Sequence, residues 1–218
     1  MAIYLKKFEN HTQYENYING SGAILPNVSL CVNENEVHYN PWVDPYAGHD
    51  YVDLGLPTGT KWAKMNIGAL SETDYGNYYQ YGKGADQYAA TSGQSNYSGT
   101  ERPLDSSVDT AVQVWGGQWH MPTLAQFIEL TANTTYEWTT INGINGGKFT
   151  ATNGNYVFFP AAGLWYNGSQ SNVGSNGLYW SSTPYGSGNA YRLYFDSGYE
   201  STGSNFRFDG ISVRPVVG

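Results

Sequence analysis

Short segments in which apolar and polar residues alternate dominate the chain after about residue 133. A period of two places successive side chains on opposite faces of an extended backbone, so these segments predict half-buried β-strands. Gly and Asn stand between the segments and predict tight turns. An earlier stretch, 51–69, alternates in the same way around Pro57-Thr58-Gly59 and predicts a hairpin. The predicted later strands are YEWTTINGINGGKFTA, NYVFFPAAG, LYWSS, AYRLYF and FDGISVRPV.

Two helices are predicted ahead of the strand-rich part. The first has apolar residues at i, i+3, i+4 and i+7 and stops at Gly116-Gly117, with the stripe Val108, Ala111, Val112 and Trp115. The second begins at Thr123, which is spaced to form a capping box with Gln126, and its buried stripe is predicted to be Leu124, Phe127 and Ile128. Helices followed by antiparallel strands indicate an α+β fold with two short helices, small antiparallel sheets and long loops.

Residues 1–45 differ from the rest of the chain. Thr12 and Glu15 predict a short helix, and NVSLCV and EVHYN around NEN predict a small hairpin. The segment is too small to hold a core alone, so we interpret it as a docking or assembly segment, serving homo-oligomer or virion assembly. Residues 46–218 are predicted to form the main domain.

Composition narrows the function classes. The chain has a net charge of -8 with only 10 Lys and Arg, and nothing resembles the basic stripe that a nucleic acid requires. No apolar run approaches the ~20 residues of a membrane-spanning helix, so no membrane insertion is expected. Cys31 is the single cysteine, which rules out a disulfide within the chain. The first ten residues lack the apolar region of a signal peptide, which favours synthesis in a cytoplasm.

The segment AYRLYFD carries the clearest functional pattern. Tyr191, Leu193 and Phe195 fall on one face of a strand and are predicted to be core. The other face, Arg192, Tyr194 and Asp196, is predicted to be displayed. Rings set among Ser, Gly and Asn form a composition typical of antibody-like binding surfaces, because Tyr and Phe give large contact area at low entropic cost. The alternative is that the rings fill a core poor in aliphatic residues.

Five motifs in this order resemble a large bacterial and phage family of C-type-lectin-fold domains: YVDLGLPTGTKWAKMNIGA, WGGQWHMPTLAQFIEL, FFPAAG, GLYWSSTP and ISVRPV. The formylglycine-generating enzymes and the variable proteins of diversity-generating retroelements share this broad fold. The N-terminal segment resembles leaders of structural proteins from gut Bacteroides and their phages.

In the retroelement-linked members, a reverse transcriptase rewrites the C-terminal coding segment at template adenines, most often in AAY codons. Such codons cannot become Lys, Glu, Gln, Met or Trp codons, and residues 181–218 contain no Lys, Gln, Met or Trp and a single Glu, Glu200. The resemblance therefore implies a variable region of about 165–216.

The function implied is non-catalytic ligand recognition, by a phage receptor-binding or tail-tip protein that attaches to a surface protein or glycan of a bacterial host. The implied location is the virion. The alternatives are a secreted or surface adhesin of a gut bacterium, or a sugar-binding lectin without diversification. The predicted ligand-binding residues are Leu178, Tyr185, Ser187, Asn189, Arg192, Tyr194, Asp196, Tyr199, Ser201, Asn205, Phe206, Phe208 and Asp209.

Enzymatic and metal chemistry are not predicted. The formylglycine-generating enzymes need paired cysteines, and Cys31 stands alone far upstream. The calcium-lectin signatures Glu-Pro-Asn and Trp-Asn-Asp are absent, and the four histidines show no metal-site or triad spacing. We expect no catalytic residue, no metal and no cofactor. Trp62, Trp115, Trp119, Trp138 and Trp180 are predicted to be core, and Arg214 is predicted to pair with a carboxylate.

Overall fold

The computed structural model describes residues 46–88, 99 and 104–218. The chain divides into two compact units, Met1–Gly48 and His49–Gly218. The helix and hairpin predicted within residues 1–45 lie outside the described residues, and the assembly role of that segment stays a prediction.

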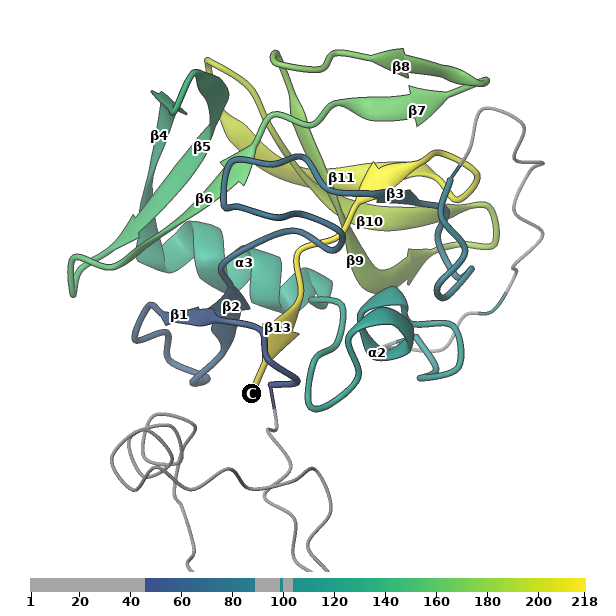
Figure 1. Cartoon of the computed structure of the whole chain (residues 1–218), viewed down its shortest axis with the longest axis horizontal. Coiled ribbons are helices and arrows are strands. Elements are labelled where there is room, and N and C mark those ends of the chain that lie inside the picture. The colour runs from purple at the N-terminus through teal and green to yellow at the C-terminus, as the bar shows by residue number, and fades with distance from the viewer. Residues whose placement is uncertain (1–45, 89–98, 100–103) are drawn as a thin grey trace, which may run out of the picture. The chain divides into compact units, whose positions relative to one another are not determined.

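The second unit is built from short strands in four sheets (Figure 1). All strand pairs are antiparallel except β12 with β9, which is parallel. The three-stranded sheets are β1 (Tyr51–Asp53), β2 (Lys61–Ala63) and β13 (Val216–Val217), and β4 (Thr134–Ile141), β5 (Ile144–Ala151) and β6 (Tyr156–Pro160). The five-stranded sheet has the order β11 (Glu200–Phe206), β10 (Asn189–Phe195), β9 (Gly177–Tyr185), β12 (Ile211–Ser212), β3 (Tyr78–Tyr79). The remaining hairpin is β7 (Leu164–Tyr166) with β8 (Ser169–Ser171).

The predicted α+β class is wrong. Strands account for 42% of the structure and helices for 9%, so the class is mostly β, and the C-type lectin fold is not supported. Both predicted helices form, but α2 (Thr110–Val114) has five residues and α3 (Leu124–Asn133) has ten. Two glycines with positive φ, Gly116 and Gly117, end α2, and the chain enters β4 directly after α3. The helices were predicted correctly as elements, but they are too short to form a layer of their own.

Local sequence explains why the helices begin where they do. Asp109 caps α2 by accepting hydrogen bonds from the backbone N–H groups of Ala111 and Val112. Thr123 caps α3 and forms the predicted capping box with Gln126. The buried stripe of α3 is corrected, because Phe127 and Leu130 are buried while Ile128 is 50% exposed. Phe127 and Leu130 are three residues apart and point into the core, whereas Ile128 lies on the opposite side of the turn.

Aromatic rings packed against glycine backbones form much of the core. Helix α3 packs against strands of both the β4–β5–β6 sheet and the five-stranded sheet (Figure 1). Between these sheets lie the rings of Phe149, Phe159 and Phe195, which meet in edge-on contacts. A Cβ atom on Gly177 would lie 1.9 Å from the ring of Phe195, so only glycine fits there. Such pairs let large rings supply the core volume in a chain with few aliphatic residues.

The tryptophan predictions are confirmed for three of the five residues. Trp62, Trp119 and Trp180 are at most 1% exposed, and Trp115 and Trp138 are half-buried.

Arg214 was predicted to pair with a carboxylate, and this prediction is wrong. Arg214 is fully buried, and its guanidinium donates to Asn66 Oδ1 and to the carbonyl oxygens of Ala63, Lys64 and Phe158. Burial lowers the pKa of Arg214 to about 10. The guanidinium therefore stabilises loop and strand carbonyls at the centre of the fold and forms no hydrogen bond to a carboxylate of the described residues.

Candidate functional site

Strand β10 separates core residues from surface residues as its alternation predicts. Leu193 and Phe195 are fully buried, while Arg192, Tyr194 and Asp196 on the other face are half-buried. Tyr191 departs from the prediction, because it is half-buried and packs against the Tyr185 ring with centroids 5.1 Å apart. The register of β9 against β10 shifts between Ala190 and Arg192, so the regular pairing is interrupted at Tyr191.

Leu178 is buried, which contradicts its prediction as a ligand-binding residue. Only 5% of its surface is exposed, although it lies opposite Tyr194 in the sheet. Strand β9 is the central strand of the five, and its two faces are both covered. Trp180, two residues along on the same face, is fully buried and donates its indole N–H to the carbonyl of Tyr79. A central strand has no solvent face for alternation to reveal.

Strand β11 is an edge strand and pairs only with β10 among the described residues. Ser201 lies opposite Tyr194, and Asn205 lies opposite Ala190. Both side chains are half-buried, and both lie beside the face of β10 that carries Arg192 and Tyr194.

Three predicted residues lie at the turn between β9 and β10: Tyr185 ends β9, Ser187 lies in the turn and Asn189 begins β10. Tyr185 is 51% exposed, Ser187 is exposed and Asn189 is half-buried. The side chain of Arg207, which is only 1% exposed, holds this turn through two hydrogen bonds. Its Nε donates to the carbonyl of Asn189 at 2.9 Å and its Nη2 to the carbonyl of Gly186 at 2.7 Å. Arg207 was not among the predicted residues, since nothing in its local sequence indicates that its side chain reaches a turn about 20 residues upstream.

The turn between β10 and β11 is organised by Asp196. Its Oδ1 accepts from the backbone N–H groups of Gly198 and Tyr199, and its Oδ2 accepts from the Tyr194 hydroxyl at 2.8 Å. These hydrogen bonds, first the one from Gly198, lower the pKa of Asp196. Tyr199 stands 54% exposed on this turn, with its ring 5.6 Å from the Tyr194 ring. Asp196 therefore shapes the turn, and its carboxylate oxygens are already occupied.

Tyr194 links the turn to the body of the unit. Its hydroxyl accepts a hydrogen bond from Nδ2 of Asn176, which precedes β9, and donates to Asp196. Burial, together with the neighbouring carboxylate, raises the pKa of Tyr194 to about 12. The hydroxyl is consequently neutral at physiological pH and acts as a hydrogen-bonding group. Asn176 was not among the predicted residues.

A third aromatic group lies at the end of β11. Phe206 is 50% exposed and stacks on half-buried Phe208, with centroids 5.0 Å apart and planes 8° apart. Tyr166, from the end of β7, is 44% exposed and meets Phe208 at 6.4 Å. The backbones of Trp165 and Gly210 exchange two hydrogen bonds, which hold the β7–β8 hairpin next to this turn. Tyr166 was missed, because only this long-range pairing brings β7 to Phe208.

Asp209 is also buried and is not a displayed acid. It is 1% exposed, since the turn in which its N–H donates to the carbonyl of Phe206 folds it inward. One carboxylate oxygen accepts from Nδ2 of Asn205 at 2.9 Å, and the other is buried without a hydrogen-bond partner. Burial raises its pKa. The prediction that Asp209 is a ligand-binding residue is therefore corrected.

We call the remaining predicted residues, together with Tyr166 and Tyr191, the displayed face. It comprises the β9–β10 and β10–β11 turns, one face of β10 and β11, and the ring group at the end of β11 with Tyr166 of β7. Its predicted members are Tyr185, Ser187, Asn189, Arg192, Tyr194, Asp196, Tyr199, Ser201, Asn205, Phe206 and Phe208.

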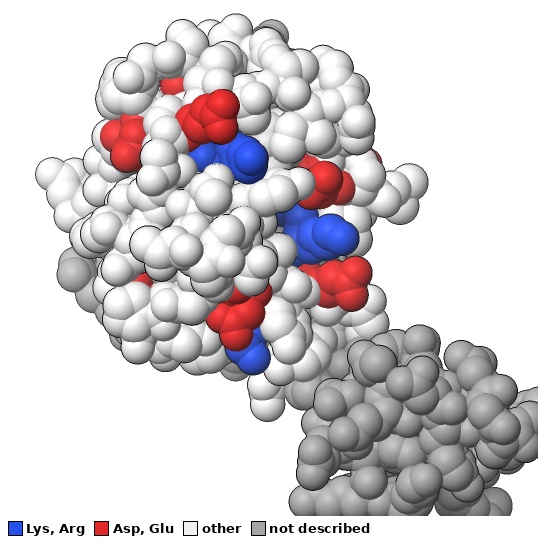
Figure 2. Space-filling view, turned by 90° about the vertical axis from the view of Figure 1, so that its left-hand side faces the viewer, with Lys and Arg blue, Asp and Glu red and all other residues white. Residues whose placement is uncertain are grey.

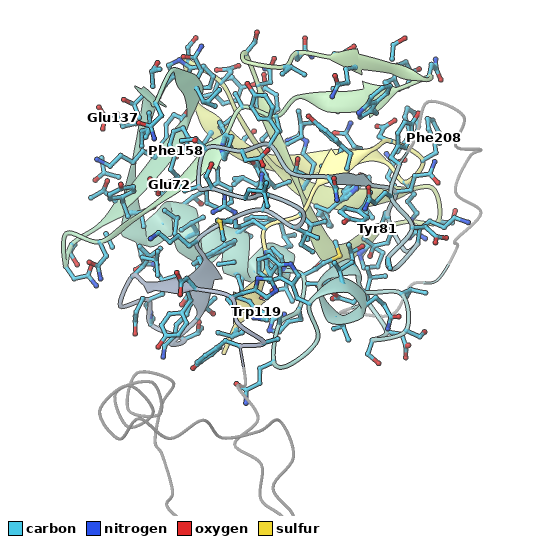
Figure 3. The ribbon with its side chains drawn as sticks, in the orientation of Figure 1. Glu72, Tyr81, Trp119, Glu137, Phe158 and Phe208 are labelled. Atoms are coloured by element: carbon cyan, nitrogen blue, oxygen red, sulfur yellow. The ribbon has the colours of Figure 1, made fainter. Side chains whose placement is uncertain are left out.

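Two hollows lie elsewhere on the unit. One of about 270 Å³ is bordered by Lys64, Glu72 and Tyr156, and one of about 650 Å³ is bordered by Asn133, Glu137 and Thr150. Neither is lined by a predicted site residue. Figure 3 shows Glu72 and Glu137 on the opposite side of the view from Phe208. Figure 2, which views that side, shows acidic and basic side chains close to one another in a largely uncharged surface.

Within the described ranges, no group of three or more His, Cys, Asp or Glu side chains is placed to hold a metal ion. Among the helices of those ranges, none is long and apolar enough to cross a membrane.

Residues 128–216 match the model of a family described as a domain of unknown function (DUF8237). The match begins within α3, runs to β13 and contains every predicted site residue. No curated protein and no solved structure shows a significant match to the chain.

Proposed function

We propose that this protein is a non-catalytic binding protein that recognises a ligand on a bacterial surface through the displayed face. The observation that carries the proposal is the exposure of three rings, Tyr185, Tyr199 and Phe206, each 50–54% exposed. Large rings that are half in water and flanked by small polar groups are typical of binding surfaces, where a few aromatic anchors supply most of the affinity. Tyr185 and Phe206 lie at one end of β10, where both are opposite Asn189, and Tyr199 lies in the turn at its other end, so rings are exposed at both ends of the strand.

Rigid support for the rings favours recognition over loose surface packing. Arg207 holds the turn of Tyr185, Asp196 holds the turn of Tyr199, and the pairing of Trp165 with Gly210 supports Phe208. A ligand would therefore meet side chains that are already ordered, which reduces the entropic cost of binding.

The proposal includes diversification by a retroelement. Residues 181–218 have the composition that AAY codons can reach, apart from Glu200. Positions on the displayed face can change without opening the core, whereas Leu193, Phe195 and Arg207 are at most 1% exposed and cannot. The setting we propose is a phage tail tip that attaches to its host, with residues 1–45 serving assembly.

The test is to sequence the DNA next to the gene. We expect a reverse transcriptase gene and a near-copy of the segment that encodes residues ~165–216. Differences between the copies should fall at template adenines and should change displayed positions such as Tyr199, while the codons for Phe195 and Arg207 match. Differences at other template bases, or differences concentrated in core codons, would contradict diversification. A face that binds host cells without any neighbouring copy would instead identify an undiversified adhesin.

A further inference from the structure

Three buried or half-buried arginines lie in the described part of the chain, and two of them are well satisfied. Arg214 donates four hydrogen bonds, and Arg207 donates from Nε and Nη2 to turn carbonyls. This fold thus supplies acceptors to guanidinium groups that have a structural role. A buried donor without an acceptor loses its hydration and gains nothing in return, so native structures rarely leave one.

Arg192 is the exception. Its Nε donates to Asn205 Oδ1 at 3.0 Å, its Nη1 is buried without a hydrogen-bond partner, and Nη2 makes no hydrogen bond within the described residues. None of the described carboxylates forms an ion pair with it. The guanidinium lies over the Tyr194 ring, 4.8 Å from the centroid, and burial lowers its pKa. A desolvated cation with two unused nitrogens is a strong site for an incoming acceptor.

The nearest acid of the same network does not neutralise Arg192. Asn205 stands between the two groups, accepting from Arg192 through Oδ1 and donating to Asp209 through Nδ2. Because Asn205 uses both ends of its amide in these hydrogen bonds, its orientation is fixed, and so is the direction of the Arg192 side chain. The guanidinium is therefore held in place but is not paired.

Gly203 adds an independent observation. It lies directly opposite Arg192 in β11, and a Cβ atom there would sit 3.2–3.3 Å from three atoms of the guanidinium. Its backbone does not have positive φ, so the local conformation does not require glycine. Glycine within a strand weakens the strand and often marks a place where a ligand approaches closely. Here the missing side chain lets the guanidinium of Arg192 lie close against the backbone of β11.

We infer that Arg192 binds a carboxylate of the ligand, with Gly203 as a positioning residue whose missing side chain gives the guanidinium room. The inference rests on the proposed function, because it names the chemical group that the displayed face recognises. A carboxylate matches the planar donor geometry of a guanidinium. Its single charge also suits a chain of net charge -8, which repels dianions such as sulfate more strongly than monoanions.

The test is a titration of the ¹⁵N-labelled full chain with sodium acetate, followed by NMR of the arginine side-chain N–H groups. Acetamide serves as the neutral probe of the same shape, sodium sulfate as the dianion, and sodium chloride keeps the ionic strength constant. We expect a saturable shift of the Arg192 signals with acetate, a weaker response to sulfate and none to acetamide. Arg207 and Arg214 should not move. An unresponsive Arg192, an equal response to acetamide, or equal shifts at all three arginines would overturn the inference.

Variants sharpen the assignment. Arg192→Lys keeps the charge but loses the planar donor pair and should weaken acetate binding by about threefold or more. Gly203→Ala should weaken it by at least about twofold, because the added methyl group crowds the guanidinium. Gly188→Ala is the matched control, since a Cβ atom there meets nothing within 4 Å. Equal acetate affinity in Gly203→Ala and Gly188→Ala would remove Gly203 from the site. The wild-type titration stands even if a variant does not fold.

Matched acid and neutral pairs then separate the sources of the carboxylate. Glucuronate with glucose represents an acidic sugar, and N-acetylglutamate with N-acetylglutamine represents an acidic side chain. Displacement of acetate by an acid but not by its neutral partner supports the inference and names the source, whereas equal displacement by a neutral partner overturns it. If Arg192 ignores acetate while the neighbouring DNA holds the template copy, the carboxylate inference fails and the proposed function survives. If Arg192 responds to acetate but the neighbouring DNA holds no template copy, the carboxylate inference survives and diversification by a retroelement fails.

Discussion

The two turns of the displayed face each present one exposed tyrosine, but different interactions hold the two turns in place. Tyr185, at the β9–β10 turn, and Tyr199, in the β10–β11 turn, are both more than half exposed. The β9–β10 turn depends on Arg207, a buried side chain from beyond the end of β11. The β10–β11 turn depends on Asp196, which bonds the backbone two and three residues further along.

The stability of the two turns therefore has different sources. A local aspartate turn forms within a few residues and is replaceable, because water can solvate the same groups when the aspartate is lost. A buried guanidinium that reaches turn carbonyls makes its hydrogen bonds only when the whole sheet has closed, and its loss removes two charge-assisted hydrogen bonds at once. Loss of its anchoring side chain should therefore destabilise the β9–β10 turn, held by Arg207, more than the β10–β11 turn, held by Asp196.

The largest effect is expected for Arg207→Met. The substitution keeps most of the side-chain volume but removes the donors to Gly186 and Asn189, so the free energy of unfolding should fall by about 3 kcal/mol. Urea unfolding measures this change. Ser187→Ala, an exposed change in the same turn, is the control and should stay within about 0.5 kcal/mol of wild type. Equal stability of Arg207→Met and Ser187→Ala would show that the turn does not need its anchor.

A smaller loss is expected for Asp196→Ala. The substitution removes acceptors for Gly198, Tyr199 and Tyr194 at a partly solvated position, and should cost about 1 kcal/mol in urea unfolding. Ser197→Ala in the same turn is the control. A cost as large as that of Arg207→Met would refute the contrast drawn between the turns.

The Asp196 contribution should also depend on pH. Because its folded pKa is lowered from the ordinary value of 3.8, the folded state favours the ionised form. The contribution is fully present above that ordinary value and disappears as the pH falls through the lowered folded pKa. The stability difference between wild type and Asp196→Ala should therefore shrink only in strong acid. A difference that shrinks already between pH 7 and pH 5 would contradict this assignment.

Asp209→Asn should change stability in the opposite direction. Burial raises the pKa of Asp209, so ionisation destabilises the folded state, and wild-type stability falls as the pH rises from 3.8 through the raised folded pKa. The amide avoids this charge and can still accept from Asn205, so the variant should be more stable than wild type at neutral pH. Unfolding followed at pH 7 and at pH 3 should show the gain at neutral pH only. A loss of stability at pH 7 would mean that the ionised carboxylate is compensated.

The smallest effect on stability and the clearest effect on binding are expected for Tyr199→Ala. The ring is 54% exposed, so unfolding should change by less than about 0.5 kcal/mol. Adsorption of the full chain to a gut Bacteroides strain that binds wild type should weaken by about tenfold or more, as for a hot-spot tyrosine. Tyr156→Ala is the control, because Tyr156 is 36% exposed on β6, away from the displayed face. Equal adsorption of the two variants would argue against recognition through Tyr199.

Several features were predictable because they depend on neighbours in the sequence. The capping box of Thr123 and Gln126 and the burial of Leu193 and Phe195 follow from spacing alone. The fold class was not predictable in this way. The helices were recognised as elements, but the class depends on how much of the chain the strands occupy, and the two helices proved short.

The errors in the predicted site share one cause. Alternation gives the relative phase of side chains along a strand, but it does not say whether the second face of that strand is covered. Leu178 lies on a central strand and Asp209 lies under a turn, so both are buried despite a sequence context like that of their exposed neighbours. Tyr166 and Arg207 were missed for the converse reason, because their partners are distant in the chain.

Short segments of the chain are enough to specify where α3 begins, where the chain turns, and which residues of β10 face the core. Those features depend on dihedral preferences and hydrogen bonds within a few residues. Long-range packing selects which of three arginines is left with unused donors, which aspartate is buried, and which rings meet at the end of β11. Such outcomes depend on the order of strands in a sheet and on the desolvation it imposes, and neither is encoded in any short segment.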